Sequence, residues 1–79
     1  MDWASLVSFI LKSYVQYPDA VLVTAYREKK KSVLVIEVDE RDRGQVIGKG
    51  GRNLQAIERV MAFYQSDARA RLPRLELQG

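Results

Sequence analysis

The sequence predicts an α+β domain in which three helices cover one face of a three-stranded mixed sheet. Two segments carry apolar stripes at helical spacing, two runs rich in β-branched residues lie between them, and a short alternating run follows the last helix. With a short capped helix in the middle, the expected order is helix, strand, strand, helix, helix, strand. No repeat or linker divides the 79 residues, so we expect one domain over residues 1–79 with a small core.

Residues 2–16 are expected to form the first helix. Its apolar stripe consists of Trp3, Leu6, Val7, Ile10 and Tyr14. Asp2 is expected to cap the amino end, and Pro18 to end the helix because proline disfavours the helical conformation at the preceding residue. Phe9 and Leu11 fall off the stripe and are therefore candidates for contact with another chain.

Residues 20–28 and 33–38 are expected to be strands, because both are rich in β-branched residues. The polar residues 29–32 between them are the expected turn of an antiparallel hairpin. Five of the six residues in 33–38 are apolar, which favours a central position in the sheet.

A short helix is expected over residues 39–47, with Asp39 as its N-cap, and a third helix over residues 52–65. Gly44 lowers the helix propensity of the short segment, so packing must hold it in place. The stripe of the third helix consists of Leu54, Ile57, Met61 and Tyr64, with Val60 beside it.

Residues 66–71 are expected to be a loop of small and charged residues, and residues 72–77 a last strand. Pro73 places this strand at an edge of the sheet, or itself at the start of the strand. The helical crossover between strand 33–38 and this last strand predicts that the two are parallel.

A cluster of glycines lies between the second and third helices. The segment comprises Val46, Ile47, Gly48, Lys49, Gly50, Gly51, Arg52, Asn53 and Leu54, and it holds three of the five glycines of the chain. Glycine costs backbone entropy, so such a cluster indicates a place where something must approach bare backbone. We expect a tight turn that holds the backbone of a nucleic acid.

Two other phosphate-binding motifs do not fit this cluster. A P-loop needs two glycines separated by four residues and then Lys followed by Ser or Thr, whereas Gly44 and Gly48 are separated by three and Gly50 follows Lys49. The dinucleotide fingerprint needs a different glycine spacing after a strand. The chain also lacks cysteine and histidine, and with them the usual metal ligands and the usual general base. We therefore expect no enzymatic activity, no cofactor and no metal.

The pattern Ile-Gly-x-x-Gly-Arg between two helices, Ile47 to Arg52, resembles the KH domain, and the element order resembles its type II arrangement, αββααβ. The length, the Pro18-Asp19 pair and the segment from Gly44 to Lys49 resemble the small bacterial single-KH proteins of the KhpA family. The resemblance implies a cytoplasmic protein that binds single-stranded RNA. It also implies pairing, as a homodimer or with a larger KH-containing protein, and a role in RNA-level control of cell shape, envelope growth and division.

About four nucleotides bind at the G-x-x-G loop of such domains. Gly48 and Gly51 would admit the sugar-phosphate backbone, and Lys49 and Arg52 would add cations. For some residues two interpretations remain open: Val46, Ile47 and Leu54 are a groove floor or core, and Asn53 bonds a base edge or the helix backbone. Gly50 replaces a residue that is often polar in the family, so weaker binding is expected.

The remaining charged residues have two interpretations. Lys29, Lys30 and Lys31 are a solvated hairpin tip or a secondary RNA contact, and the net charge of +3 fits a polyanion partner. The acidic residues Glu37, Asp39, Glu40 and Asp42 are interpreted as caps and solvated surface, because the arginines among them argue against a metal site. No apolar run approaches the ~20 residues of a membrane span. The alternative function is a protein–protein adaptor with little RNA affinity.

Overall fold

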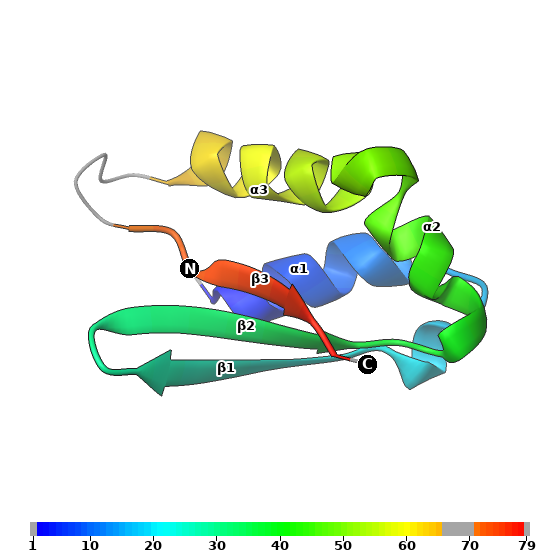
Figure 1. Ribbon diagram of the computed structural model, residues 1–79, viewed down its shortest axis with the longest axis horizontal. Helices are drawn as coiled ribbons and strands as arrows, with labels where there is room; N and C mark the ends of the chain where they lie inside the picture. The colour runs from blue at the N-terminus through cyan, green and yellow to red at the C-terminus, as the bar shows by residue number, and fades with distance from the viewer. Residues whose placement is uncertain (1, 66–70, 79) are drawn as a thin grey trace.

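The computed structural model describes residues 2–65 and 71–78, and it has the predicted order of elements (Figure 1). The helices and strands are α1 (Trp3–Lys12), β1 (Leu22–Glu28), β2 (Lys31–Glu37), α2 (Arg43–Ile47), α3 (Arg52–Tyr64) and β3 (Arg74–Leu77). Short 3₁₀ turns precede β1, α2 and α3, and they are η1 (Pro18–Ala20), η2 (Glu40–Asp42) and η3 (Lys49–Gly51). The predicted α+β architecture is confirmed.

The sheet has the strand order β1-β2-β3, with β1 antiparallel and β3 parallel to β2. The predictions of an antiparallel hairpin, a central second strand and a parallel last strand are therefore confirmed. β3 is an edge strand, and it begins at Arg74, directly after Pro73. This position suits proline, which has no N–H to donate to a neighbouring strand.

The core lies between the sheet and the helices. Leu34 and Ile36 share one face of β2, and they are buried together with residues from α1, α2 and α3. The most deeply buried apolar side chains are Val7, Leu11, Leu34, Ile36, Val46, Ile57 and Met61. Full burial of each such side chain contributes roughly 1.5–3 kcal/mol to stability, so this small set largely decides whether the chain folds.

The buried stripe of α1 differs from the predicted one. Leu11, expected off the stripe, is fully buried and follows the equally buried Val7 by four residues, whereas Trp3 and Tyr14 are only partly buried. The helix contacts both β1 and α3, so its buried face is wider than a single stripe. Phe9 is 72% exposed, as the sequence predicted.

The first helix is also shorter than predicted, because it ends at Lys12 rather than near residue 16. The hydroxyl and the N–H of Ser13 both bond to the carbonyl of Ile10, which tightens the last turn. The N–H groups of Gln16 and Tyr17 donate to the carboxylate of Asp42 instead of continuing the helix. A contact from a distant part of the chain thus takes the backbone donors of Gln16 and Tyr17, at the end of the helix that the sequence predicted. The predicted cap at the other end is confirmed, since Asp2 accepts from the N–H of Ala4.

The hairpin turn is shorter than predicted, because four residues were assigned to it from their polarity. Glu28 pairs with Lys31 across the ladder, so only Lys29 and Lys30 form the turn, and Lys31 and Ser32 belong to β2. Lys29 has a φ of 54°, the left-handed conformation that such a short connection requires. At the exposed end of a hairpin, polar residues form the hydrogen-bonded ladder just as apolar residues do. Of the predicted loop 66–71, residues 66–70 lie outside the described part of the chain.

Candidate nucleic-acid interface

The turn between α2 and α3 uses three glycines in conformations that other residues rarely adopt. Gly48, Gly50 and Gly51 have φ values of 72°, 66° and 79°. At Gly48 this φ is combined with a ψ of 171°, a combination that is essentially restricted to glycine. The cluster recognised in the sequence therefore lets the chain leave α2 and enter α3 within four residues.

Asn53 locks this turn from the side of α3. Its side-chain Nδ2 donates to the carbonyl of Gln45, near the end of α2. A Cβ at Gly48 would lie 2.7 Å from Asn53 Cγ and 2.9 Å from Asn53 Nδ2, so this lock also requires glycine at position 48. Of the two interpretations open for Asn53, the structure shows the bond to the helix backbone.

Gly48→Ala is expected to lower the free energy of unfolding by about 2–4 kcal/mol, through its backbone conformation and the clash with Asn53. Gly44→Ala is the matched control, because Gly44 lies in α2 at an ordinary φ with nothing within 4 Å of its missing Cβ. This control should be neutral or stabilise the fold by up to about 1 kcal/mol. Urea unfolding of both variants measures the difference, and equal effects would contradict the proposed lock.

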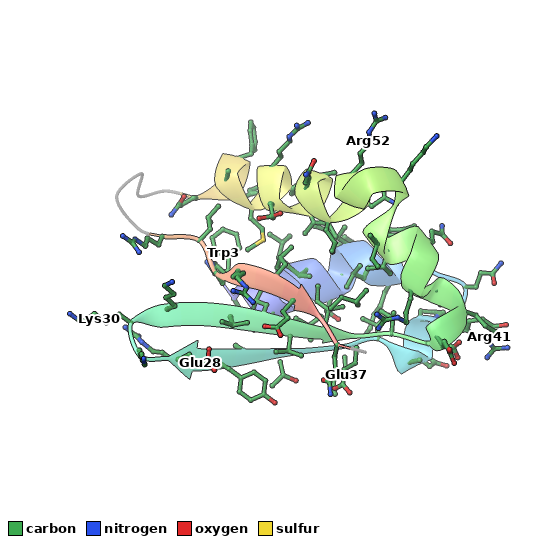
Figure 2. All side chains as sticks on the ribbon, in the orientation of Figure 1. Trp3, Glu28, Lys30, Glu37, Arg41 and Arg52 are labelled. Atoms are coloured by element: carbon green, nitrogen blue, oxygen red, sulfur yellow. The ribbon has the colours of Figure 1, made fainter. Side chains whose placement is uncertain are left out.

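The turn presents both backbone and charge on the surface. Lys49, Gly50, Arg52 and Asn53 are exposed, and Arg52 points away from the sheet (Figure 2). No side chain caps the amino end of α3, although the N–H of its first residue, Arg52, bonds to the backbone carbonyl of Lys49. The partial positive charge of the first turn, together with both cations, makes this end of α3 attractive to an anion.

The apolar residues beside the turn divide into core and surface. Val46 is fully buried in the main core, so its side chain anchors α2 and does not reach the surface. Ile47 and Leu54 are partly buried, and Leu54 packs against the core. Of the three residues proposed as a groove floor, only these two have side-chain surface that a ligand can contact.

Helix α2 has only five residues and depends on contacts from the rest of the chain. Gln45 Nε2 donates to the carbonyl of Tyr14 at 3.1 Å, and Arg43 donates to the carbonyl of Gln78. These contacts tie α2 to the segment after α1 and to the segment after β3. The position of the glycine turn is thus set by two separate parts of the chain.

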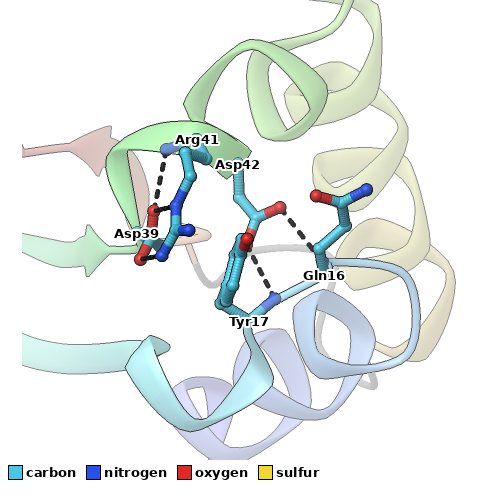
Figure 3. A network of polar contacts seen from close by, with 5 residues as sticks. All are labelled: Gln16, Tyr17, Asp39, Arg41 and Asp42. Carbon is cyan, nitrogen blue, oxygen red and sulfur yellow. Dashed lines mark hydrogen bonds and ion pairs between the residues drawn. The ribbon is translucent and has the colours of Figure 1, made fainter.

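A buried carboxylate adds the strongest of these ties (Figure 3). Asp42 is 1% exposed, and its two oxygens accept from the N–H groups of Gln16 and Tyr17, each at 3.0 Å. The sequence predicted a cap or solvated surface for Asp42, and that interpretation is wrong. The two carboxylate oxygens of Asp42 accept from two adjacent backbone N–H groups that lie 26 and 25 residues away in the chain. No local sequence pattern signals such a tertiary contact.

Asp39, beside it, caps the 3₁₀ turn η2 and not α2, because the single helix predicted over residues 39–47 is divided into these two elements. It accepts from the N–H of Arg41 at 2.9 Å, and the guanidinium of Arg41 meets both carboxylate oxygens at 2.9 Å. These hydrogen bonds lower the pKa of Asp39 to about 2. The same guanidinium lies over the ring of Tyr17, 3.7 Å from its centroid. Asp39 and Arg41 therefore lie on the outer side of the hydrogen bond between Tyr17 and Asp42.

A family profile described as "KhpA/KhpB, KH domain" matches residues 4–77. The chain belongs to this KhpA/KhpB family of KH domains. The resemblance inferred from Ile47 to Arg52 and from the element order is confirmed, and with it the type II KH fold, αββααβ.

Curated relatives from several bacteria carry the name "RNA-binding protein KhpA". The protein of Thermotoga maritima is 36% identical over 64 residues, covering 81% of this chain and 85% of the relative. That of Oceanobacillus iheyensis is 34% identical over 68 residues, covering 86% and 91%, and that of Leifsonia xyli is 30% identical over 69 residues, covering 87% and 91%. No solved structure matches the chain.

In this KhpA/KhpB-family chain, the second predicted basic site lies far from the glycine turn. Lys29, Lys30 and Lys31 are exposed at the tip of the β1-β2 hairpin, at the end of the molecule opposite the α2-α3 turn (Figure 1). Within residues 2–65 and 71–78, no group of three or more Asp or Glu residues is arranged to hold a metal ion. In the same ranges, no helix is long and apolar enough to span a membrane.

Proposed function

We propose that this KhpA/KhpB-family protein binds single-stranded RNA at the turn between α2 and α3. The observation that carries the proposal is a three-glycine turn with exposed Lys49, Gly50 and Arg52, at the amino end of α3, which no side chain caps. Three relatives that align over most of this chain are named RNA-binding proteins. The family profile covers residues 4–77, and we propose that the whole chain acts as one KH domain.

Each residue of the site has a proposed role. Gly50 and Gly51, which have open space at their missing Cβ atoms, admit the sugar-phosphate backbone, whereas Gly48 makes room for Asn53. The partial positive charge at the amino end of α3 attracts a phosphate. Lys49 supplies a mobile cation and Arg52 a forked one. Ile47 and Leu54 offer apolar surface to the bases. Val46 anchors α2 in the core, and Asn53 holds the turn through its hydrogen bond to Gln45.

The site should bind RNA only moderately. It has two cations, and no aromatic residue stands within residues 46–54 for bases to stack on. Gly50 contributes no side-chain contact. We expect an affinity of roughly micromolar or weaker at physiological salt. The test is to place two carboxylates in the turn, as Lys49→Asp with Gly50→Asp, and to measure binding of single-stranded RNA.

Pairing of two chains is the second part of the proposal, because two weak sites joined in one assembly gain affinity through avidity. The exposed face of α3 carries Val60, Phe63 and Tyr64, which are 37%, 83% and 54% exposed. Beside Val60 lies an apolar hollow of about 200 Å³ between α1 and α3. The hydroxyl of Tyr14, which lines this hollow, is buried without a hydrogen-bond partner among the described residues, and burial raises its pKa. We propose that a second copy of the chain packs here.

Sedimentation velocity at several concentrations tests the pairing. The wild type is expected to change from monomer to dimer as concentration rises, and Phe63→Ser to shift that change to at least about tenfold higher concentration. Phe9→Ser is the matched control, since Phe9 is 72% exposed but lies beside Leu22 and Val23 of β1. A monomeric wild type, or an equal effect of both variants, would contradict the proposed interface.

The remaining expectations follow from family membership. We propose that the protein acts in the cytoplasm, without enzymatic activity, in RNA-level control of cell shape, envelope growth and division. A larger KH-containing protein is the alternative partner on the same face of α3. A protein–protein adaptor with little RNA affinity remains the rival function. The loop variant, Lys49→Asp with Gly50→Asp, separates it from RNA binding.

A further inference from the structure

A second group of cations surrounds one hollow at the end of the molecule away from the glycine turn. The five basic residues that line it are Arg27 of β1, Lys30 of the hairpin turn, Lys31 of β2, Arg71 before β3 and Arg74 at the start of β3. Ser32 and Leu72 complete the lining, and the hollow measures about 450 Å³. The sequence indicated Lys30 and Lys31, but not the three arginines that the fold brings to them.

The charge of this group is poorly balanced by the protein itself. No acidic side chain among the described residues lines the hollow. Within the same part of the chain, Arg74 is the one member with an ion-pair partner, Glu76, and their closest atoms are 3.5 Å apart. Glu28 lies opposite Lys31 in the ladder, but it does not line the hollow. Like charges held this close repel one another, and a bound polyanion would relieve the repulsion.

The hollow is separate from the clamp, which is the proposed RNA-binding turn between α2 and α3 at residues 46–54. The molecule is 36 Å along its longest axis, and the hairpin tip and the α2-α3 turn lie toward its two ends (Figure 1). In Figure 2, Lys30 marks one end and Arg52 lies toward the other. A strand of about four nucleotides that fills the glycine turn therefore needs further nucleotides to reach the hairpin.

We propose that this hollow is a second phosphate-binding site, which holds the backbone of a single-stranded RNA longer than the clamp alone accepts. Three of its five cations are arginines, whose planar forks match phosphate oxygens in pairs. Its concave shape suits a strand better than a flat membrane surface. This inference rests on the proposed RNA-binding function, and it extends the footprint of that function along the molecule.

The test compares two variants that each remove two positive charges. Lys30→Gln with Arg71→Gln changes the hollow at residues that make no hydrogen bond or ion pair with a described residue. Lys12→Gln with Arg59→Gln is the matched control, because both residues are exposed and line neither the hollow nor the glycine turn. Fluorescence anisotropy measures binding of an RNA of about 4 nucleotides and of one of about 12 nucleotides.

The hollow variant is expected to bind the long RNA about tenfold more weakly near physiological salt. Its salt slope should be shallower by about 1.4, because each of the two phosphates that it no longer neutralises accounts for about 0.7. Its binding of the short RNA should match the wild type, and the control variant should match the wild type on the long RNA. Melting curves of all variants verify that the fold is retained.

Each failure has a distinct meaning. If the hollow variant binds the long RNA as the control does, the second site is wrong. The same follows if the hollow variant loses binding to phosphatidylglycerol vesicles while its RNA affinity is unchanged, which would assign the hollow to a membrane. If the loop variant Lys49→Asp with Gly50→Asp still binds the short RNA as the wild type does, it is the clamp at the glycine turn that is wrong.

Discussion

Asp42→Ala is expected to lower the free energy of unfolding by about 3–5 kcal/mol. The substitution leaves the N–H groups of Gln16 and Tyr17 without their acceptor, and hydrogen bonds to a charged group contribute about 1.5–3 kcal/mol each (Figure 3). It also leaves a void in the core, where the side chain is 1% exposed. A small domain has only about 5–15 kcal/mol of stability, so a large part of it would be lost.

Thermal and urea unfolding measure this loss, and Asp39→Ala is the matched control. Both substitutions remove one carboxylate from the segment before α2, but Asp39 bonds to the neighbouring Arg41 at the surface rather than to a distant backbone. We expect a melting temperature lower by at least about 10 °C for Asp42→Ala and a much smaller change for the control. Similar losses in both variants would show that the buried contact to Gln16 and Tyr17 is not a principal tie of α2.

Lys49→Asp with Gly50→Asp is expected to weaken binding of single-stranded RNA by roughly 30- to 150-fold. Each carboxylate placed about 4 Å from a phosphate costs about 1 kcal/mol in water, and loss of the lysine removes one phosphate contact. The sum of about 2–3 kcal/mol corresponds to that range. The fold should persist, because Lys49 is exposed, Gly50 has nothing within 4 Å of its missing Cβ, and aspartate tolerates a φ of 66° better than most residues. Anisotropy and melting curves measure both effects.

Lys49→Asn with Gly50→Asn is the control for this variant, since asparagine has the shape of aspartate without its charge. It should lose only the phosphate contact of the lysine, about a fourfold effect near physiological salt. If the two variants bind RNA equally weakly, the shape of the turn and not its charge controls binding. If both bind as the wild type does, the turn is not the RNA site, and the adaptor function is favoured.

The sequence predicted the glycine turn because its signal is local. Gly48, Gly50 and Gly51 lie within four positions, and the apolar stripe and the cap of Asp39 mark the elements around them. The same local logic gave the hairpin, the central β2 and the edge position of β3. Each of these depends on residues close together in the chain and on their ordinary conformational preferences.

What the sequence could not predict depends on contacts between distant segments. Asp42 looked like a cap because nothing near it in the chain shows that Gln16 and Tyr17 would need an acceptor. The predicted extension of α1 to residue 16 is wrong partly for the same reason, because the N–H of Gln16 bonds to Asp42. Arg71 and Arg74 reach the lysines of the hairpin because Arg74 lies opposite Val33 in the parallel β2-β3 pair, a register that the predicted strand direction alone did not give.

RNA is proposed to contact this protein at the turn between α2 and α3. Photocrosslinking of a single-stranded RNA, followed by identification of the crosslinked peptides by mass spectrometry, locates this contact. Crosslinks of the wild type are expected to concentrate in residues 46–54, with a weaker set at the β1-β2 hairpin. Those in 46–54 should largely disappear in Lys49→Asp with Gly50→Asp while the melting temperature stays close to that of the wild type. Crosslinks found only on other elements, or an undiminished yield at 46–54 in the variant, would contradict the proposed contact.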